Sequence, residues 1–292
     1  MNWLRKVLVT ALVIAFLCPA VVYADISDDA VWEIGVEYQG AYDPLQIYYA
    51  WGQAIRLDPI LASDDIAFDF QYYLRRFSDF SNPLYRGDDY AGEEDFKYYG
   101  LGGIDYIRID AVDVGMWVGH GPEWYNPYYG TYTGWLAFYN NRDDHFLYPT
   151  NARWGDQDLD WIFLSTCNFL KNYGSVAQMN RLYDMMEGVH QILGFASSMY
   201  EHPYSGMTLA WLLTGQIKPP PEYPLPVYNI IDSWIKNAEY WQPQGKGIRA
   251  RIKYYKADYG DCLPGFGFSG WQPVPWSPSL AEFYDYRDYV VQ

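Results

Sequence analysis

Short runs of consecutive hydrophobic residues alternate with turn-forming segments along most of the chain. Three of these runs cover residues 111–118, 161–165 and 191–196, and a turn follows each of them. Continuous hydrophobicity, rather than strict alternation, is typical of strands that are buried on both faces of a parallel sheet. The three runs therefore predict strands at the centre of an α/β fold.

Other segments predict the elements around these strands. Residues 32–38 and 248–255 are rich in β-branched and aromatic side chains, which favours a first and a last strand. Hydrophobic residues recur at helical spacing over residues 63–76, and helices are also predicted over 175–187 and 228–240. Helices that alternate with hydrophobic strands predict a three-layer sandwich with a mostly parallel central sheet.

Two segments lack a clear period. Residues 78–103 cluster Asp, Glu, Gly and Tyr, which predicts a loop-rich surface insertion, and the Gly- and Pro-rich tail from residue 265 is expected to wrap the surface. The acidic runs 88–89, 93–95 and 143–144 are expected to be solvated.

The N-terminus has the pattern of a signal peptide. The first six residues carry two positive charges and no negative charge, the apolar run from Val7 to Val22 follows, and Ala24 ends a cleavage-site pattern. We expect cleavage after residue 24, and residues 25–292 should then form a single exported domain. An uncleaved anchor is the alternative, but after cleavage no later segment is expected to span a membrane.

Charge and composition restrict the partners. The net charge is −16, and it becomes −18 once Arg5 and Lys6 are removed with the signal peptide. Such an acidic chain disfavours nucleic acid and anionic membranes as partners. Aromatic residues form 20% of the sequence, and Tyr and Trp suit sugar-binding clefts and interfaces.

Two reactive side chains follow predicted strands. His120 and Gly121 follow the strand over 111–118, and Cys167 follows the strand over 161–165. Ligands of open parallel sheets bind beyond the carboxyl ends of the strands, so neighbouring strands would bring His120 and Cys167 to one crevice. An imidazole beside a thiol can take its proton and later return it to a leaving group.

Backbone groups near these residues fit the same chemistry. The amides of Gly121 and Cys167 could form an oxyanion hole. Residues 168–173 could begin a helix, whose dipole would lower the pKa of the thiol.

An apolar strand that ends in His-Gly, followed by one that ends in a small residue and Cys, resembles the caspase, legumain and gingipain superfamily of cysteine peptidases. The interval from His120 to Cys167 is 47 residues, near the spacing of about 50 in caspases. The resemblance implies a caspase-like α/β domain over residues 25–292, with His120 and Cys167 as the catalytic pair and the amide of Gly121 as a third contributor. Ser165 and Thr166 replace the Gln-Ala of caspases, so specificity for aspartate is not implied.

The chain also resembles an uncharacterised family of exported microbial domains. The segments that carry this resemblance are residues 35–37, 112–113, 119–121, 152–156, 161, 166–167, 188–195 and 260–265.

Plainer roles remain open for each of these residues. Export favours a disulfide between Cys167 and Cys262, the two cysteines that remain after cleavage. Cys167 could also be an inert buried thiol, and His120 could simply hydrogen-bond a loop.

Further polar residues have structural interpretations. His190 begins an apolar strand and is expected to form structural hydrogen bonds. Asp113 and Glu37 lie within predicted strands and are expected to be solvated or paired in the core. The alternating acids of segment 156–160 suggest Ca²⁺ ligands, but the segment lacks the glycine and the distal glutamate of a Ca²⁺ loop.

The leading hypothesis is an exported thiol hydrolase that acts on peptides or proteins, with no metal and no cofactor. The alternative is a non-catalytic domain of the same fold whose aromatic surface binds envelope glycans or proteins. Glycoside hydrolysis is a third possibility, although the spacing indicates no particular pair of carboxylates.

Overall fold

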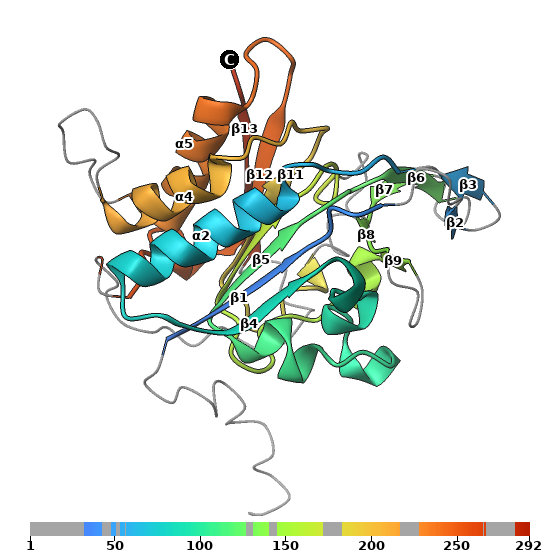
Figure 1. The fold of residues 1–292 in the computed structure, drawn as a ribbon, viewed down its shortest axis with the longest axis horizontal. Helices are drawn as coiled ribbons and strands as arrows, with labels where there is room; N and C mark the ends of the chain where they lie inside the picture. The colour runs from blue at the N-terminus through green and yellow to red at the C-terminus, as the bar shows by residue number, and fades with distance from the viewer. Residues whose placement is uncertain are drawn as a thin grey trace, which may run out of the picture.

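A seven-stranded mixed sheet forms the centre of the molecule (Figure 1). The computed structural model describes residues 32–42, 48–50, 53–55, 57–126, 131–139, 145–171, 183–216, 228–264, 266 and 284–292. The strand order is β13-β12-β11-β10-β5-β1-β4. The five strands from β11 to β4 are parallel, while β12 runs antiparallel to β11 and to β13.

The strands of the main sheet are β1 (Glu33–Tyr38), β4 (Ser81–Gly87), β5 (Val114–Val118), β10 (Trp161–Ser165), β11 (Gln191–Phe195), β12 (Arg249–Tyr255) and β13 (Tyr284–Val290). Three two-stranded sheets are formed by β2 (Tyr48–Ala50) with β3 (Gln53–Ile55), β6 (Glu123–Asn126) with β7 (Thr131–Gly134), and β8 (Leu136–Ala137) with β9 (Phe146–Leu147).

The α-helices of the described residues are α2 (Ser63–Phe77), α4 (Ser205–Thr214) and α5 (Ile230–Trp241). The 3₁₀-helices are η1 (Asp88–Tyr90), η2 (Glu93–Asp95), η3 (Tyr99–Leu101), η4 (Asp105–Ile107), η5 (Ile109–Ala111), η6 (Pro149–Asn151) and η7 (Lys256–Asp258).

The predicted centre of the fold is confirmed. Strand β10 has the predicted bounds, and β5 and β11 lie within the other two hydrophobic runs. In β10, Trp161 and Phe163 join the core on one face of the sheet, while Ile162 and Leu164 join the core on the other. Successive side chains of a strand point to opposite faces, so a strand buried on both faces requires an uninterrupted hydrophobic run.

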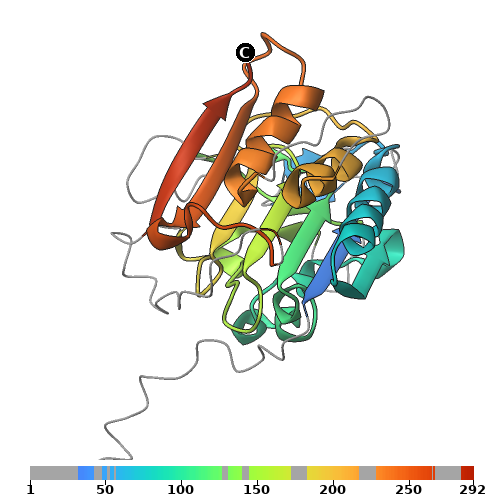
Figure 2. The same cartoon turned by 90° about the vertical axis from the view of Figure 1, so that its left-hand side faces the viewer.

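The two faces of the sheet are covered differently. Helices α2, α4 and α5 lie together on one face, as Figures 1 and 2 show. The core on the other face contains Phe96, which directly follows η2, and Trp154 and Leu159, which lie outside the helices and the named strands. Most of the helix predicted over residues 175–187 lies outside the described residues, which resume at 183.

The prediction of a loop-rich insertion over residues 78–103 was wrong in part. Strand β4 pairs in parallel with β1 at the edge of the main sheet. The strand was not recognised because Asn82, Pro83 and Gly87 are poor strand formers, and an edge strand tolerates a proline.

The acidic run 93–95 was wrongly expected to be solvated. Glu93 and Asp95 are fully buried. Lys97 lies 3.3 Å from Glu93, and Arg108 lies 3.2 Å from Asp95. These cations compensate for burial of the acids, and the identity of the cations is not evident from the acidic run alone.

The tail beyond residue 265 contributes more than a surface wrapping. Residues 284–290 form β13, which pairs with the whole of β12 at the second edge of the sheet (Figure 2). Residues 285–290 alternate between half-buried and exposed, which is typical of an antiparallel strand with one face towards solvent.

The predicted signal peptide, residues 1–24, lies outside the described residues. None of the helices in the described part of the chain has the length and hydrophobicity that crossing a lipid bilayer requires.

Candidate functional site

Strands β5 and β10 are neighbours, so the residues that follow them lie side by side. Val118 and Ser165, the last residues of the two strands, face each other in register. The amide of Gly119 donates a hydrogen bond of 3.3 Å to the carbonyl of Ser165, which continues the pairing past the strands. His120 and Cys167 therefore each lie two residues beyond the same point of the sheet.

Gly121 allows the two segments to touch. A methyl group on its Cα would lie 1.8 Å from the carbonyl oxygen of Cys167. The side-chain amide of Asn168 donates a hydrogen bond of 3.4 Å to the carbonyl of Gly121. The two chain segments that carry the predicted residues are thus in direct backbone contact.

The ring of His120 is held on two sides. Its Nε2 lies 2.7 Å from the carbonyl oxygen of Asp58, and a carbonyl only accepts, so Nε2 carries the proton. The ring packs against Tyr42 with 4.7 Å between centroids. Burial lowers the pKa of His120, although the carbonyl and the charge of Asp58 oppose this effect. A neutral imidazole with a basic Nδ1 is the result.

The thiol of Cys167 contacts the backbone of Met199. The amide of Met199 donates to Sγ at 3.2 Å, and Sγ lies 3.6 Å from the carbonyl oxygen of the same residue. Burial raises the pKa of the Cys167 thiol, the Met199 amide lowers it, and the charge of Glu201 raises it. The thiol is therefore protonated at neutral pH.

The predicted helix dipole does not act on this thiol. Residues 168–171 form a bend and a turn rather than a helix, and Asn168 has a φ of 58°. Its amide donates to the carbonyl of Ser197 at 3.0 Å, which directs the chain towards the loop after β11.

Glu201 is a member of the site that the sequence analysis missed. Burial raises the pKa of its carboxyl to about 8, and its Oε2 has no hydrogen-bond partner in the described part of the chain. Glu201 lies in the loop after β11, the neighbour of β10. His120 and Cys167 were selected because ligands bind beyond the carboxyl ends of parallel strands. A search for carboxylates in the loop after each predicted strand would have found Glu201 as well.

Cys167 and Cys262 are free thiols at opposite ends of the sheet. Cys167 follows the end of β10, whereas Cys262 follows Asp261, whose carboxylate accepts a hydrogen bond from Trp161 at the start of β10. A five-residue strand spans about 16 Å. A disulfide requires Cα atoms within about 7 Å, so the disulfide alternative is wrong in this structure.

The remaining polar candidates lie apart from His120 and Cys167. The Nδ1 of His190 lies 3.0 Å from the carboxylate of Asp261, which agrees with its predicted hydrogen-bonding role. Asp113 accepts a hydrogen bond of 2.6 Å from the amide of Glu33. Glu37 is fully buried in β1, and neither of its oxygens has a nitrogen or hydroxyl donor among the residues that the structure describes.

The acids of segment 156–160 do not meet at one point. Asp156 interacts with Asp110, while Asp160 lies 3.5 Å from the Nε2 of His190. Among the described residues, the one group of three potential metal ligands with all ligand atoms within 4.8 Å of one another is His190, Asp258 and Asp261.

Comparison with known proteins gives the family but no activity. A family described as a domain of unknown function (DUF6345) matches residues 58–273, which is more than half of the chain and includes His120, Cys167 and Glu201. No curated protein and no solved structure matches the sequence. The chain therefore belongs to the DUF6345 family of domains of unknown function.

Proposed function

We propose that the protein is a thiol hydrolase of the cysteine-peptidase type, with Cys167 as nucleophile and His120 as general base and acid. The observation that carries the proposal is the register of Val118 with Ser165, which sets His120 and Cys167 beyond the ends of adjacent parallel strands. A kinship with the caspase, legumain and gingipain superfamily belongs to the same proposal. It is supported by the His-Gly and Cys positions after these strands.

The resting pair is neutral rather than an ion pair. Burial lowers the pKa of His120 and raises the pKa of Cys167, so the proton stays on sulfur until a substrate binds. The Nδ1 of His120 is the nitrogen available as a base, because Nε2 donates to Asp58. Hydrogen bonds between catalytic groups often tighten only as the reaction begins, so Sγ would exchange the backbone of Met199 for the imidazole when a substrate or another electrophile, such as iodoacetamide, reacts with it.

The reaction follows from these roles. Sγ attacks the carbonyl carbon of an amide while Nδ1 takes the thiol proton, which produces a tetrahedral oxyanion. The amides of Gly121 and Cys167 donate no other hydrogen bond among the described residues, and they would stabilise this oxyanion. The C–N bond breaks as Nδ1 returns the proton to the amine. Water, deprotonated by the same nitrogen, then cleaves the thioester.

The decisive experiment compares variants of the two cysteines on a library of fluorogenic peptide amides. The parent chain and Cys262→Ala should cleave the same peptides at similar rates, whereas Cys167→Ala should be inactive. His120→Gln should lose about 100-fold or more in kcat/KM. Activity of Cys167→Ala at the level of Cys262→Ala would refute the mechanism.

Thiol alkylation gives a readout that requires no substrate. Iodoacetamide labelling with peptide mapping should modify Cys167 more slowly in His120→Gln than in the parent chain, while the rate for Cys262 stays the same. Equal rates for Cys167 in the two proteins would count against His120 as its base.

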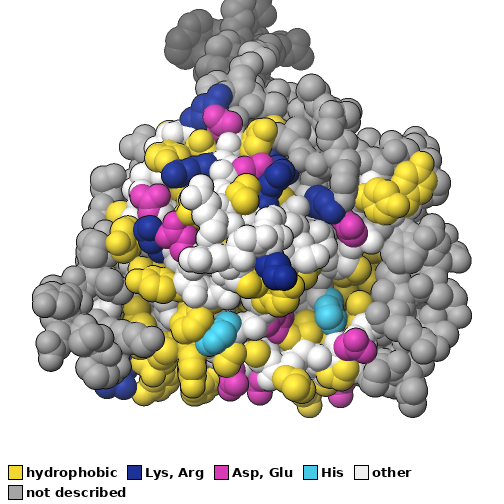
Figure 3. Space-filling view, turned by 90° about the horizontal axis from the view of Figure 1, so that it is seen from above, with side chains coloured by type: hydrophobic (Ala, Val, Ile, Leu, Met, Phe, Trp, Pro, Cys, Tyr) yellow, Lys and Arg dark blue, Asp and Glu magenta, His cyan; other side chains and the backbone are white. Residues whose placement is uncertain are grey.

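A hollow beside β4 supports the alternative of glycan binding. Its volume is about 650 Å³, and its lining includes Tyr38, Tyr85, Tyr90, Arg86 and Arg108. The side chain of Tyr90 is 69% exposed, so its ring offers a surface on which a sugar could stack. Figure 3 shows, for one face of the molecule, hydrophobic side chains set between cationic and acidic ones.

Affinity electrophoresis in gels that contain envelope polysaccharide tests this alternative. Retardation of the parent chain that is lost in Tyr90→Ala and kept in Cys167→Ala would establish a binding site at the hollow. Equal mobility of parent and Tyr90→Ala in every gel would exclude the site.

Export is part of the proposal as well. The charged start, the apolar run and Ala24 support removal of residues 1–24. N-terminal sequencing of the chain recovered outside the cytoplasm should begin at Asp25, and an intact Met1 would contradict cleavage.

A further inference from the structure

Three potential metal ligands meet at the end of the sheet opposite Cys167. His190 directly precedes β11, Asp258 ends η7 after β12, and Asp261 follows in the next turn. The Nδ1 of His190 lies 3.0 Å from Oδ2 of Asp261 and 3.9 Å from Oδ2 of Asp258. His190 and Asp261 lie in segments 188–195 and 260–265, two of the segments that carry the resemblance to the uncharacterised family. The proposed thiol mechanism assigns no role to either residue.

Asp258 indicates that this group is more than an ion pair. It is 1% exposed, and its Oδ2 has no hydrogen-bond partner in the described part of the chain. A buried carboxylate oxygen without a donor is costly unless a cation occupies the position that it faces. The oxygen faces Nδ1 of His190, and the cluster has excess negative charge because Asp160 lies on the other side of the ring.

The surroundings hold the three ligands in place. Asp160 lies 3.5 Å from Nε2 of His190, so it can accept the Nε2 proton and leave Nδ1 to face the two carboxylates. The indole of Trp161 donates to Oδ2 of Asp261 at 3.2 Å. The amide of Asp261 donates to the carbonyl of Asp258 at 3.1 Å, which closes the turn between the two acids.

We propose that Nδ1 of His190 and the carboxylates of Asp258 and Asp261 bind a divalent metal ion of the zinc type. Zinc accepts imidazole nitrogen and carboxylate oxygen at about 2.0–2.2 Å, so ligand atoms around it are about 3.3–3.6 Å apart. The distance from Nδ1 of His190 to Oδ2 of Asp261, 3.0 Å, is slightly below this range, and the distance to Oδ2 of Asp258, 3.9 Å, is slightly above it. Three protein ligands leave the fourth position of a tetrahedral ion for water.

The metal would act on the fold rather than on the thiol chemistry. The site joins the start of β11 to the segment after β12, and Cys167 lies beyond the far end of β10. Binding requires the loss of the Nδ1 proton, which His190 otherwise shares with Asp261. The ion would thus replace a proton as the cation that holds the two acids together.

Isothermal titration of the EDTA-stripped chain with Zn²⁺ tests the proposal. The parent chain should bind one ion per chain with a Kd of about 1 μM or tighter, and Asp258→Asn should bind at least about tenfold more weakly. The double variant His120→Gln, Cys167→Ser removes the other thiol and imidazole pair, so it should bind as the parent does. Equal affinity of Asp258→Asn and the parent would overturn the proposal, as would the absence of binding to the parent.

Two further measurements distinguish a loss of zinc ligands in Asp258→Asn from a failure of this variant to fold. At the same Zn²⁺ concentration, the Tm of the parent should rise more than that of Asp258→Asn, because the weaker site stabilises the folded chain less, while in EDTA the variant should unfold at or above the Tm of the parent. X-ray absorption of the zinc-loaded parent should show imidazole and oxygen ligands. A sulfur ligand, or stabilisation by Ca²⁺ but not by Zn²⁺, would overturn the assignment.

Discussion

Val118 and Ser165 lie opposite each other at the ends of β5 and β10, and His120 and Cys167 each follow two residues later. This register, rather than the sequence interval between the histidine and the cysteine, brings the two segments together. Their backbones then touch at Gly121, which has no space for a side chain. The arrangement depends on local packing, and small substitutions can therefore test it.

Gly121→Ala should disturb the site directly. The added methyl group would lie 1.8 Å from the carbonyl oxygen of Cys167 and 2.5 Å from Oγ1 of Thr166, so the two segments would have to separate. We expect a loss of about 1–3 kcal/mol in the free energy of unfolding, together with altered alkylation of Cys167. Urea denaturation and peptide mapping measure the two effects.

Gly260→Ala is the matched control, because a methyl group there meets nothing within 4 Å. If both alanine variants unfold at the same urea concentration, the close contact at Gly121 does not contribute to stability.

Glu201→Gln should make the thiol easier to ionise. Burial keeps the carboxyl of Glu201 protonated up to a pKa of about 8, and its negative charge above that pH raises the pKa of Cys167. Removal of this charge should move the alkylation profile of Cys167 to lower pH, with labelling at pH 9 on the order of a few times faster.

Cys262 of the same protein serves as the internal control for this profile. Its pKa is raised by burial and by Asp261, not by Glu201. A parallel change at both cysteines would indicate a general loosening of the fold instead of a local charge effect.

The centre of the fold could be predicted from the sequence because burial on both faces leaves a strong pattern. Residues 161–165 form a strand with the bounds that the hydrophobic run predicted. Helix α2 followed from helical spacing in the same way, since its hydrophobic side chains pack on one face of the sheet. In each of these segments, the hydrophobic pattern of the segment itself predicts which of its side chains are buried.

The edges of the sheet and the second outer layer could not be predicted in this way. Strand β4 contains Pro83, and β13 mixes polar and aromatic residues without strict alternation, within a tail whose sequence otherwise predicts a loop. The burial of Glu93 and Asp95 depends on cations that only folding brings near. The pairing of these edge strands and of these buried acids joins residues far apart in the sequence, so local composition does not predict it.

The candidate sites also differ in how far local sequence patterns could predict them. His120 and Cys167 could be predicted because each directly follows a strong strand. Glu201 required knowledge that β11 is the neighbour of β10. The residues of the proposed zinc site could not be grouped from the sequence, because His190 and Asp261 are 71 residues apart. The sequence analysis accordingly expected no metal.

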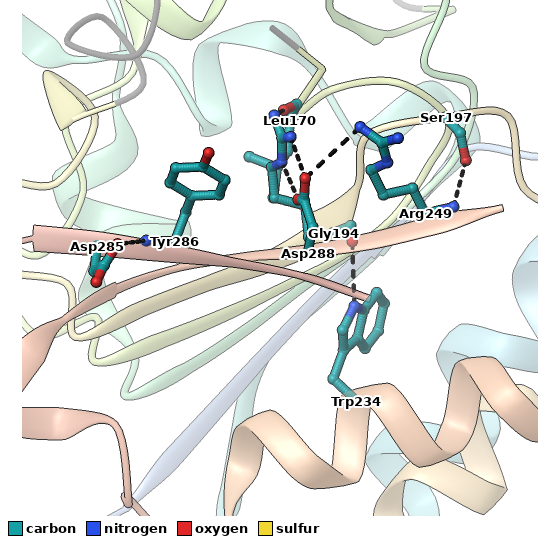
Figure 4. Close-up of polar contacts among 9 residues, drawn as sticks. Leu170, Gly194, Ser197, Trp234, Arg249, Asp285, Tyr286 and Asp288 are labelled. Carbon is teal, nitrogen blue, oxygen red and sulfur yellow. Dashed lines mark hydrogen bonds and ion pairs between the residues drawn. The ribbon is translucent and has the colours of Figure 1, made fainter. Parts of the chain in front are cut away.

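Asp288→Asn should weaken the attachment of β13 to β12. The carboxylate of Asp288 pairs with the guanidinium of Arg251 through two contacts of 2.5 and 2.6 Å, and Arg251 is only 4% exposed. Figure 4 shows Asp288 beside Leu170, whose carbonyl accepts another hydrogen bond from Arg251 at 3.0 Å. Loss of the bidentate pair should cost about 1–3 kcal/mol of unfolding free energy in urea.

Asp285→Asn on the same strand is the control for this change. The carboxylate of Asp285 accepts a hydrogen bond from the neighbouring Tyr286 amide, as Figure 4 also shows. Its replacement should change the stability by less than about 0.5 kcal/mol. Equal effects of the two substitutions would indicate that the ion pair with Arg251 contributes no net stability.

Glu37→Gln should remove a pH dependence of folding. Glu37 is fully buried in β1, and burial with the charge of Asp95 raises its pKa well above the ordinary value of 4.5. The folded chain therefore keeps a proton that the unfolded chain releases above that pH. The stability that this group provides is complete below pH 4.5 and is lost as the pH rises through the folded pKa.

Urea denaturation between pH 5 and 9 measures this effect. The unfolding free energy of the parent should fall relative to that of Glu37→Gln, with a difference in slope of up to about 1.4 kcal/mol per pH unit. Asp65→Asn, which replaces an exposed carboxylate on α2, should follow the parent. If Glu37→Gln also follows the parent at every pH, Glu37 is ionised in the folded chain, and the nearby Arg86 and Arg108 then compensate for its burial.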